Sequence, residues 1–308
     1  MSETVESITP ADAPEPAKTP APVKDSRGNI IWREVKGLIW VLLAVLLFHS
    51  FVAKPFYIPS ESMMPKLLVG DRLVVTKYPY GWSYVSPTIP NPAAMFRTLV
   101  LRRPAEPWGI TLPFMKGRIL GHLPERGDIV VVTPPGKDED YIKRVIGLPG
   151  DTIEMRGGRL ILNGEPVKSE VRPNLMLAVD ANAPCTIDKF YNRLVDTPQG
   201  PRCALPIVRE TLPNGVSYDT IDEGNGASSG DNYGPVKIPA DHVFLMGDNR
   251  DHSADSRYSQ SDLGLGGPVP FENIGGRAEF ITFSMDGSGL FGFRSDRSGN
   301  SLRGSSKS

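Results

Sequence analysis

The sequence lacks the patterns that mark the common nucleotide and metal sites. Its 308 residues contain no Walker A loop, no Gly-rich dinucleotide turn and no paired-cysteine zinc spacing, and the four histidines never form the HExxH pattern. Its charge is almost balanced, with 34 Lys and Arg against 35 Asp and Glu, so no broad positive field attracts nucleic acid. We therefore expect no cofactor, no metal ion and no nucleic-acid partner.

Charged residues are also absent from one long apolar run, GLIWVLLAVLLFHSFVA, at residues 37–53. Its seventeen residues rise about 25 Å as a helix, slightly less than a hydrocarbon core of about 30 Å, and the flanking Lys36 and Lys54 can extend to the interfaces. We predict a single transmembrane helix here. Residues 1–36 are expected to form a disordered cytoplasmic tail, because residues 1–28 are rich in Pro, Ala, Glu, Ser and Thr.

A removable signal peptide is the alternative interpretation of this run, because a basic stretch precedes it. Cleavage after Ala53 would put Phe51 at the third position back, and cleavage after Ser50 would put Phe48 there, where a small residue is required. We therefore prefer a membrane anchor. The basic residues before the run slightly outnumber those after it, which favours a cytoplasmic N-terminus and an extracytoplasmic remainder. They are Lys24, Arg27, Arg33 and Lys36 before the run, and Lys54, Lys66 and Arg72 after it.

Short β-branched runs bounded by Gly and Pro follow the apolar run, with no long amphipathic helix between them. Such runs are typical of strands, so we predict a mostly β, antiparallel domain at residues 54–284. Within it, residues 165–240 predict a loop-rich β insertion, and residues 285–308 predict a flexible C-terminal tail. The expected strands are 71–77, 127–133, 140–147, 151–157, 158–164, 241–247 and 277–284.

The chain has only two cysteines, Cys185 and Cys203, and both lie in the predicted insertion. In an extracytoplasmic domain they form a disulfide that staples the insertion, or they remain two buried free thiols. The sequence leaves both possibilities open.

Two serines follow the apolar run closely, in the segment YIPSESMMPKL at residues 57–67. Pro59 and Pro65 cannot both sit inside one regular helix, so we expect a turn or loop around Ser60 and Ser62. A serine hydroxyl is a poor nucleophile without a base. The rest of the sequence must therefore supply one.

Lys143, in DYIKRVIGLPGD, is the best candidate for that base. In a strand it shares a face with Tyr141 and Val145, and an apolar setting disfavours the ammonium form and lowers the lysine pKa. Action near pH 8 requires a decrease of two to three pKa units, about 3 to 4 kcal/mol. The neighbouring Arg144 has a far higher pKa and cannot serve as this base. The alternative for Lys143 is a solvated charge at a strand edge.

A third polar segment, GDNRDHSADSRYS, covers residues 247–259. Ser253, Asp255 and Arg257 alternate, so an extended backbone would direct them to one side. The hydroxyl would then hold a neutral lysine amine while the Asp and Arg pair. An ordinary Asx-rich turn is the alternative. A Ser-His-Asp triad that uses His252 and Asp255 is disfavoured, because these two lie only three residues apart.

Four segments of the chain, in this order after the apolar run, resemble the bacterial type I signal peptidases, also called leader peptidases. They are PSESMMPKL, GDRLVVTK, YIKRVIGLPGD and GDNRDHSADSR. The resemblance implies that Ser62 is the nucleophile and Lys143 the general base, and that the Ser60 hydroxyl and the Ser62 backbone N–H stabilise the oxyanion. Ser253 would orient the lysine amine. The charged residues that the resemblance implies as braces of the site are Asp248, Asp255, Arg144 and Arg257.

The chain departs from this family at three points. Glu61 stands where the best-known members have Gly, Lys66 stands where many have Thr, and one span is expected where many have two. Glu61 adds negative charge beside the nucleophile, which tends to raise the Lys143 pKa. Glu61 therefore affects the expected pH optimum and not the assigned roles.

The resemblance implies a membrane-anchored serine endopeptidase that removes N-terminal signal peptides from exported pre-proteins after small, Ala-x-Ala-like residues. Its expected location is the inner (plasma) membrane, with the catalytic domain periplasmic, and its expected partners are pre-proteins and the lipid bilayer. Aromatic side chains between residues 82 and 115 either touch lipid headgroups or pack in the core.

Two other functions remain open. Self-cleaving repressors use the same Ser/Lys chemistry but need a DNA-binding helix-turn-helix where this chain has an apolar run. A catalytically silent, anchored β module that scaffolds envelope partners is the alternative from another class.

Overall fold

The structure is a computed structural model, and the chain divides into two compact units, Met1–Ala44 and Val45–Ser308. The residues that it describes are 27–86, 89–90, 109–110, 117–137, 139–182, 185, 190, 193–289 and 292–304.

The N-terminal helix α1 (Arg27–Phe51) contains the predicted apolar run and begins before it. Leu, a strong helix former, is the most frequent residue of the run, no proline interrupts it, and the helix ends shortly before Pro55. Within the described residues, no helix combines the length and the apolar character needed to cross a membrane, so the predicted span is not confirmed. The helix also includes residues 27–36 of the predicted disordered tail, whereas residues 1–26 lie outside the described part of the chain.

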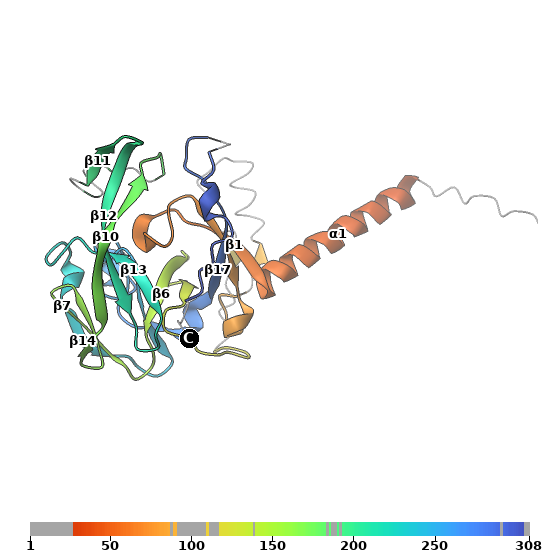
Figure 1. Cartoon of the computed structure of the whole chain (residues 1–308). Coiled ribbons are helices and arrows are strands. Elements are labelled where there is room, and N and C mark those ends of the chain that lie inside the picture. Colours follow the sequence, from red (N-terminus) through yellow and green to blue (C-terminus); the bar gives the residue numbers. More distant parts are fainter. Residues whose placement is uncertain are drawn as a thin grey trace, which may run out of the picture. The chain divides into compact units, whose positions relative to one another are not determined.

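A seven-stranded antiparallel sheet, here called the central sheet, forms the core of the second unit (Figure 1). Alternate residues of β5 face opposite sides of this sheet. Ile129 and Val131 pack in one apolar cluster with Leu73, whereas Val130 and Val132 pack in another. The strands, in spatial order, are β1 (Ala53–Tyr57), β2 (Asp71–Thr76), β17 (Ile274–Ser284), β5 (Ile129–Val132), β6 (Tyr141–Gly147), β15 (His242–Met246) and β16 (Val269–Pro270).

A second antiparallel sheet buries Ile153 and Leu160 in a cluster that also contains Phe244 of the central sheet. Its strands are β14 (Tyr233–Lys237), β7 (Thr152–Arg156), β8 (Arg159–Leu162) and β9 (Glu165–Pro166). The seven predicted strands are therefore all present, and the prediction of a mostly β, antiparallel fold is confirmed.

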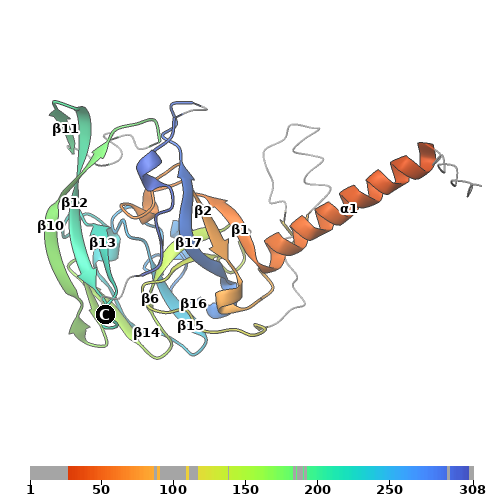
Figure 2. The ribbon, with the colours of Figure 1, turned by 45° about the vertical axis from the view of Figure 1, so that its right-hand side comes forward.

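The inserted segment is richer in strands than we predicted. A further antiparallel sheet, here called the inserted sheet, occupies most of residues 168–221 (Figure 2). Its longest strand carries Pro201 and Pro206, and β10 carries Pro173 at a register shift. Most β10 side chains are exposed, so β10 has neither the buried alternation nor the uninterrupted run that predicts a strand. The strands are β10 (Lys168–Ala178), β12 (Gly200–Thr211), β11 (Leu194–Thr197) and β13 (Ser217–Ile221).

The remaining regular elements are short. They are the strands β3 (Ile89–Pro90) and β4 (Gly109–Ile110), and the 3-10 helices η1 (Glu61–Met63), η2 (Tyr78–Tyr80), η3 (Ser229–Asp231), η4 (Gln260–Asp262), η5 (Phe271–Asn273) and η6 (Ser295–Arg297). Most of the predicted lipid-facing segment, residues 82–115, lies outside the described residues.

The C-terminal segment differs from the flexible tail that we predicted. Leu302 is only 1% exposed and packs in a core cluster with Leu73 and Ile281. The Arg297 guanidinium binds the Asp71 carboxylate at 2.5 Å, and the Ile281 N–H donates to the Asn300 carbonyl. Apolar packing, backbone hydrogen bonds and the ion pairs of Arg294, Arg297 and Arg303 therefore hold a segment whose composition is otherwise typical of a tail.

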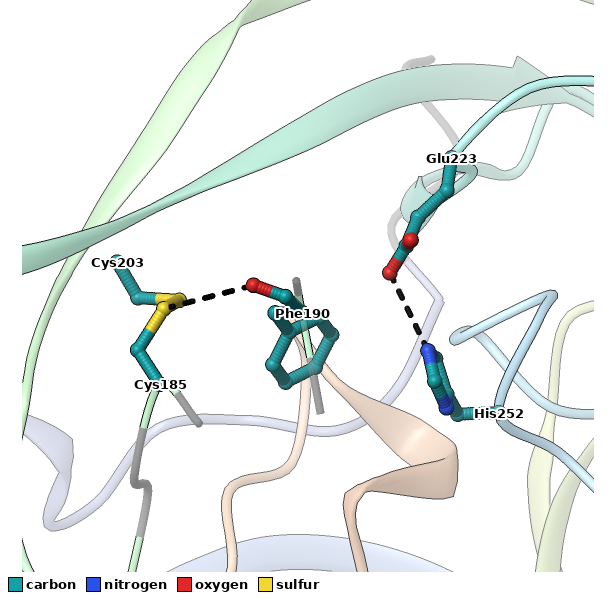
Figure 3. The surroundings of a disulfide bond; sticks show 5 residues. All are labelled: Cys185, Phe190, Cys203, Glu223 and His252. Atoms are coloured by element: carbon teal, nitrogen blue, oxygen red, sulfur yellow. Dashed lines mark hydrogen bonds and ion pairs between the residues drawn. A yellow bond between two sulfur atoms is a disulfide. The ribbon is translucent and has the colours of Figure 1, made fainter. Parts of the chain in front are cut away.

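Cys185 and Cys203 form a disulfide, which realises the first of the two possibilities that the sequence left open (Figure 3). Cys203 lies in β12 and packs with Phe190, Leu205 and Met64 in one buried cluster. The disulfide thus belongs to the same apolar core as part of the serine segment.

Candidate active site

The serine segment links β1 to β2 and places Ser62 in η1, where its residue is 8% exposed. The next two side chains, Met63 and Met64, are fully buried in different clusters. Met63 packs with Ile58 and Leu67, whereas Met64 packs against the inserted sheet. Because two separate cores hold consecutive residues, the position of the Ser62 hydroxyl is fixed by packing.

Lys143 lies in β6, and its Nζ is 2.9 Å from the Ser62 Oγ. The same amine donates to the Ile142 carbonyl at 3.0 Å. Burial lowers the pKa of Lys143 from 10.5 to about 8, although the carboxylates of Asp255 and Asp248 favour its charged form. The structure therefore brings together a hydroxyl and an amine that is neutral in about half of the molecules near pH 8.

The polar segment after β15 lies directly against the serine segment. A Cβ at Gly247 would come within 2.1 Å of the Ser253 Oγ and 2.5 Å of the Ser62 carbonyl oxygen. The Asn249 backbone N–H donates to that carbonyl at 3.1 Å, and the Asn249 amide donates to the Glu61 carbonyl at 3.3 Å. Glycine at position 247 allows the two segments to approach this closely.

Two buried ion pairs lie beside the amine. Arg144 donates two hydrogen bonds to Asp248, at 2.7 and 2.6 Å, and Arg257 donates two to Asp255, both at 2.9 Å. Burial alone would lower the pKa of each arginine and raise that of Asp255. The pairing outweighs burial, so the pKa of each arginine lies above its usual value and that of Asp255 lies below it.

The sequence did not predict a third buried ion pair. The Arg250 guanidinium donates to both Glu210 oxygens, at 2.7 and 2.5 Å, and the Tyr218 hydroxyl donates to the same carboxylate at 2.7 Å. Arg250 lies in the GDNRD motif, which was the available signal. Glu210 lies in β12 and Tyr218 in β13, and neither stands in a recognisable motif.

The two other serines with predicted roles, Ser253 and Ser60, lie in different surroundings. Residues 253–257 form irregular backbone followed by a bend and a turn rather than a strand, yet Ser253, Asp255 and Arg257 are all buried. Within the described part of the chain, the Ser253 Oγ is buried and has no hydrogen-bond partner. The exposed Ser60 has its Oγ 3.4 Å from the Ser62 Oγ.

A groove of about 380 Å³ opens over Ser62 and Lys143. Residues 56–62 line one wall and residues 139–143 the other. Every residue of both runs contributes, whereas a strand that presented only one face would contribute every second residue. Two runs of consecutive residues thus line the groove, an arrangement compatible with a site for an extended chain. A larger cavity of about 1230 Å³ includes Arg144 in its wall but neither Ser62 nor Lys143.

His252 also lines the groove, but it does not form the triad considered above. Its Nε2 lies 3.2 Å from Glu223, and its ring packs against Phe190, with 5.3 Å between the ring centroids (Figure 3). Asp255, the third member of that triad, is paired with Arg257 instead. Chemically, the arrangement offers a serine nucleophile with a lysine base.

Comparison with known proteins supplies an independent view. The sequence profile of the family described as "Signal peptidase, peptidase S26" matches residues 31–283. Signal peptidase I of Rickettsia bellii (strain OSU 85-389) is 32% identical over 258 residues, which cover 82% of this chain and 73% of that protein. Signal peptidase I of Pseudomonas fluorescens is 32% identical over 255 residues, which cover 81% of this chain and 71% of that protein. A crystal structure of signal peptidase I from Enterococcus faecalis V583 shares 24% identity and covers 51% of this chain and 97% of that one, with a TM-score of 0.26.

Proposed function

The chain belongs to the signal peptidase family, peptidase S26, and from this premise we propose that it removes N-terminal signal peptides from exported pre-proteins with a Ser62/Lys143 dyad. The observation that carries the proposal is the 2.9 Å between the Lys143 Nζ and the Ser62 Oγ. The lowered pKa of Lys143, about 8, supports the role of this amine as a base.

The reaction begins when the neutral Lys143 amine takes the Ser62 proton as the Ser62 oxygen attacks the scissile carbonyl. The Ser60 hydroxyl and the Ser62 backbone N–H donate to the oxyanion, where one donor typically contributes about 10² to 10³ in rate. The Lys143 ammonium then protonates the leaving amine. Water hydrolyses the acyl-enzyme and restores the serine hydroxyl.

The supporting groups hold this dyad in place. We infer that the Ser253 hydroxyl turns toward the Lys143 amine during the reaction, because it is buried beside Ser62 and has no other described partner. Asp248 with Arg144, and Asp255 with Arg257, fix the strand and the loop that flank the amine. Their bidentate geometry favours one arrangement of each side chain.

The substrate enters as an extended segment between the two walls of the groove, with small residues such as Ala-x-Ala at the cleavage site. We propose that the apolar run at residues 37–53 anchors the enzyme in the inner (plasma) membrane with its N-terminus cytoplasmic and residues 54–284 periplasmic. Ser62 follows this run by nine residues, which span at most about 30 Å. A pre-protein held in the same bilayer would thus present its cleavage site within reach.

The test is cleavage of an Ala-x-Ala peptide by the purified protein and by three variants. Ser62→Ala and Lys143→Ala should each lower kcat/KM by at least about 10³, because each removes one half of the dyad. Ser253→Ala should lower kcat without lowering the melting temperature, since the lost hydroxyl makes no hydrogen bond with any described residue.

Wild-type activity in Ser62→Ala or in Lys143→Ala would reject the dyad. An unchanged kcat in Ser253→Ala would reject its orienting role alone. A wild-type protein that cuts no peptide would favour the catalytically silent module instead.

A further inference from the structure

The catalytic groove carries more acidic than basic side chains. Glu61 lies on the wall formed by residues 56–62, and Glu139 and Asp140 lie on the opposite wall. Lys143 is the only Lys or Arg among the residues that line the groove in the described part of the chain, and it is buried at its base. An extended substrate would therefore pass between carboxylates on both sides.

The three carboxylates differ in how far other groups offset their charge. Asp140 accepts a hydrogen bond from Thr133 at 2.7 Å and lies 3.8 Å from the Lys54 amine. Glu139 is exposed and has no hydrogen bond or ion pair with any described residue. Glu61 is partly exposed and directly precedes the nucleophile. Glu139 thus carries a charge that no described residue offsets, and Glu61 carries its charge next to the nucleophile in the sequence.

Other charged groups near the groove already have partners. The Lys137 amine lies 3.3 Å from the Tyr141 hydroxyl, and Lys54 is paired with Asp140. His252 is held by Glu223 at 3.2 Å. The described residues therefore leave the charge of Glu139 without a counterion until a substrate binds.

We propose that Glu61 and Glu139 select substrates that carry a lysine or arginine beside the cleavage site. This inference rests on the proposed function and adds a charge preference to it. A basic substrate residue between the walls gains an attraction that a neutral one lacks, whereas an acidic residue is repelled by both walls. For partly exposed pairs of this kind, the gain corresponds to roughly 1.5-fold to fivefold per carboxylate in kcat/KM.

The experiment uses the full-length enzyme and a set of Ala-x-Ala peptides that differ at one position. Lys, Gln or Glu is placed in turn at each of the positions that flank the cleaved bond, outside the two Ala positions. With wild-type enzyme, kcat/KM at one or more positions should follow the order Lys above Gln above Glu. The Lys-to-Gln ratio should decrease in 0.5 M NaCl, because salt at this concentration screens charges that lie more than about a few ångströms apart.

The decisive comparison is this Lys-to-Gln ratio within each variant, which cancels any general change in activity. The double variant Glu61→Gln/Glu139→Gln should bring the ratio close to one. Glu165→Gln, which removes an exposed carboxylate of β9 outside the groove, should retain the wild-type ratio. Equal ratios in wild type and in the double variant would overturn the proposal, as would equal rates for all three peptides.

Failure of the proposed function gives a different result, because no peptide of any charge would then be cleaved. In that case, binding of the same peptides to the Ser62→Ala variant, measured by fluorescence anisotropy, still decides the charge preference. Tighter binding of the Lys peptide that depends on Glu61 and Glu139 supports it, and equal binding of the Lys, Gln and Glu peptides rejects it.

Discussion

Lys143 is subject to two opposing electrostatic influences. Burial lowers its pKa to about 8, whereas the carboxylates of Asp255 and Asp248 favour its charged form. Both carboxylates are paired with an arginine, Arg257 and Arg144, so their fields at the amine are partly offset. Without these pairs, the two buried carboxylates would hold the lysine in its charged form at a higher pH. The ion pairs therefore help to set the pH at which the Lys143 amine becomes neutral, as its proposed role as a base requires.

The activity should depend on pH through the Lys143 amine. Below the Lys143 pKa of about 8, kcat/KM should fall about tenfold per pH unit, because only the neutral amine accepts the Ser62 proton. Above that pH the profile should become level. Asp255→Asn should move this limb to lower pH, since it removes a carboxylate that favours the ammonium form.

The measurement is the pH profile of kcat/KM, with circular dichroism to select conditions in which each variant is folded. Asp196→Asn serves as the control, because it removes an exposed carboxylate of β11 that lines neither cavity described above. A limb that stays at the same pH in Asp255→Asn, or that moves equally in the control, would assign the titration to another group.

Which site residues could be predicted depended on whether each carries a local signal. Ser62 and Lys143 stand in segments whose composition is unusual, and the structure brings them together. The Arg250 and Glu210 pair was missed because its members lie 40 residues apart and Glu210 has no motif around it. The hydrogen-bonding state of Ser253 was not predictable either, since it depends on how the loop turns.

Contacts with several other elements fix the serine segment. Met63 packs in a core cluster with side chains of the central sheet, and Met64 and Leu68 pack with side chains of the inserted sheet. The loop after β15 then closes over the Ser62 carbonyl through the Asn249 N–H. Ser62, the proposed nucleophile, is therefore positioned by contacts from three different parts of the chain.

Replacement of Gly247 should disturb the contact between the serine segment and the loop after β15. An alanine Cβ there would lie 2.1 Å from the Ser253 Oγ and 2.5 Å from the Ser62 carbonyl oxygen, so the two segments must separate. Because displacement of a catalytic group by about 1 Å can cost about 100-fold, Gly247→Ala should lower kcat/KM by at least that factor. Gly275→Ala is the matched control, because its Cβ would meet only an ordinary contact at 3.7 Å.

Peptide cleavage assays and thermal melts of both glycine variants provide the measurement. Full activity in Gly247→Ala would show that the close approach of the two segments is not required. A loss of activity of the same size in Gly275→Ala would indicate general damage to the sheet.

The strands that could be predicted are those whose apolar side chains enter a core. β5 is buried at every residue and β15 at nearly every one, and both were found from their β-branched and apolar runs. β10 is exposed along most of its eleven residues and is held mainly by its pairing with β12. Backbone hydrogen bonds do not require a periodic pattern of apolar residues, so a strand of this kind cannot be predicted from the sequence pattern.

At the scale of the whole molecule, the inserted sheet supports the proposed catalytic centre. Leu205 and Ile207 of β12 pack against Met64 of the serine segment, and Glu210 of the same strand binds Arg250 in the motif loop. The insertion thus contributes both an apolar contact and an ion pair to the site. Changes within it should therefore affect catalysis as well as stability.

The membrane anchor is the remaining proposal at this scale. Along α1, Leu42 and Val45 are 54% and 47% exposed, within the apolar run at residues 37–53. If lipid surrounds this run, replacement of both residues by arginine should cost about 2.5 to 3.5 kcal/mol for each charge near the helix centre. After expression in bacterial cells and an alkaline carbonate wash, the wild-type chain should stay in the membrane pellet and Leu42→Arg/Val45→Arg should be released. Ile30→Arg/Ile31→Arg adds the same two charges to the same helix before the run, so it should stay in the pellet. Release of the wild-type chain, or equal retention of both double variants, would mean that residues 37–53 do not anchor the enzyme.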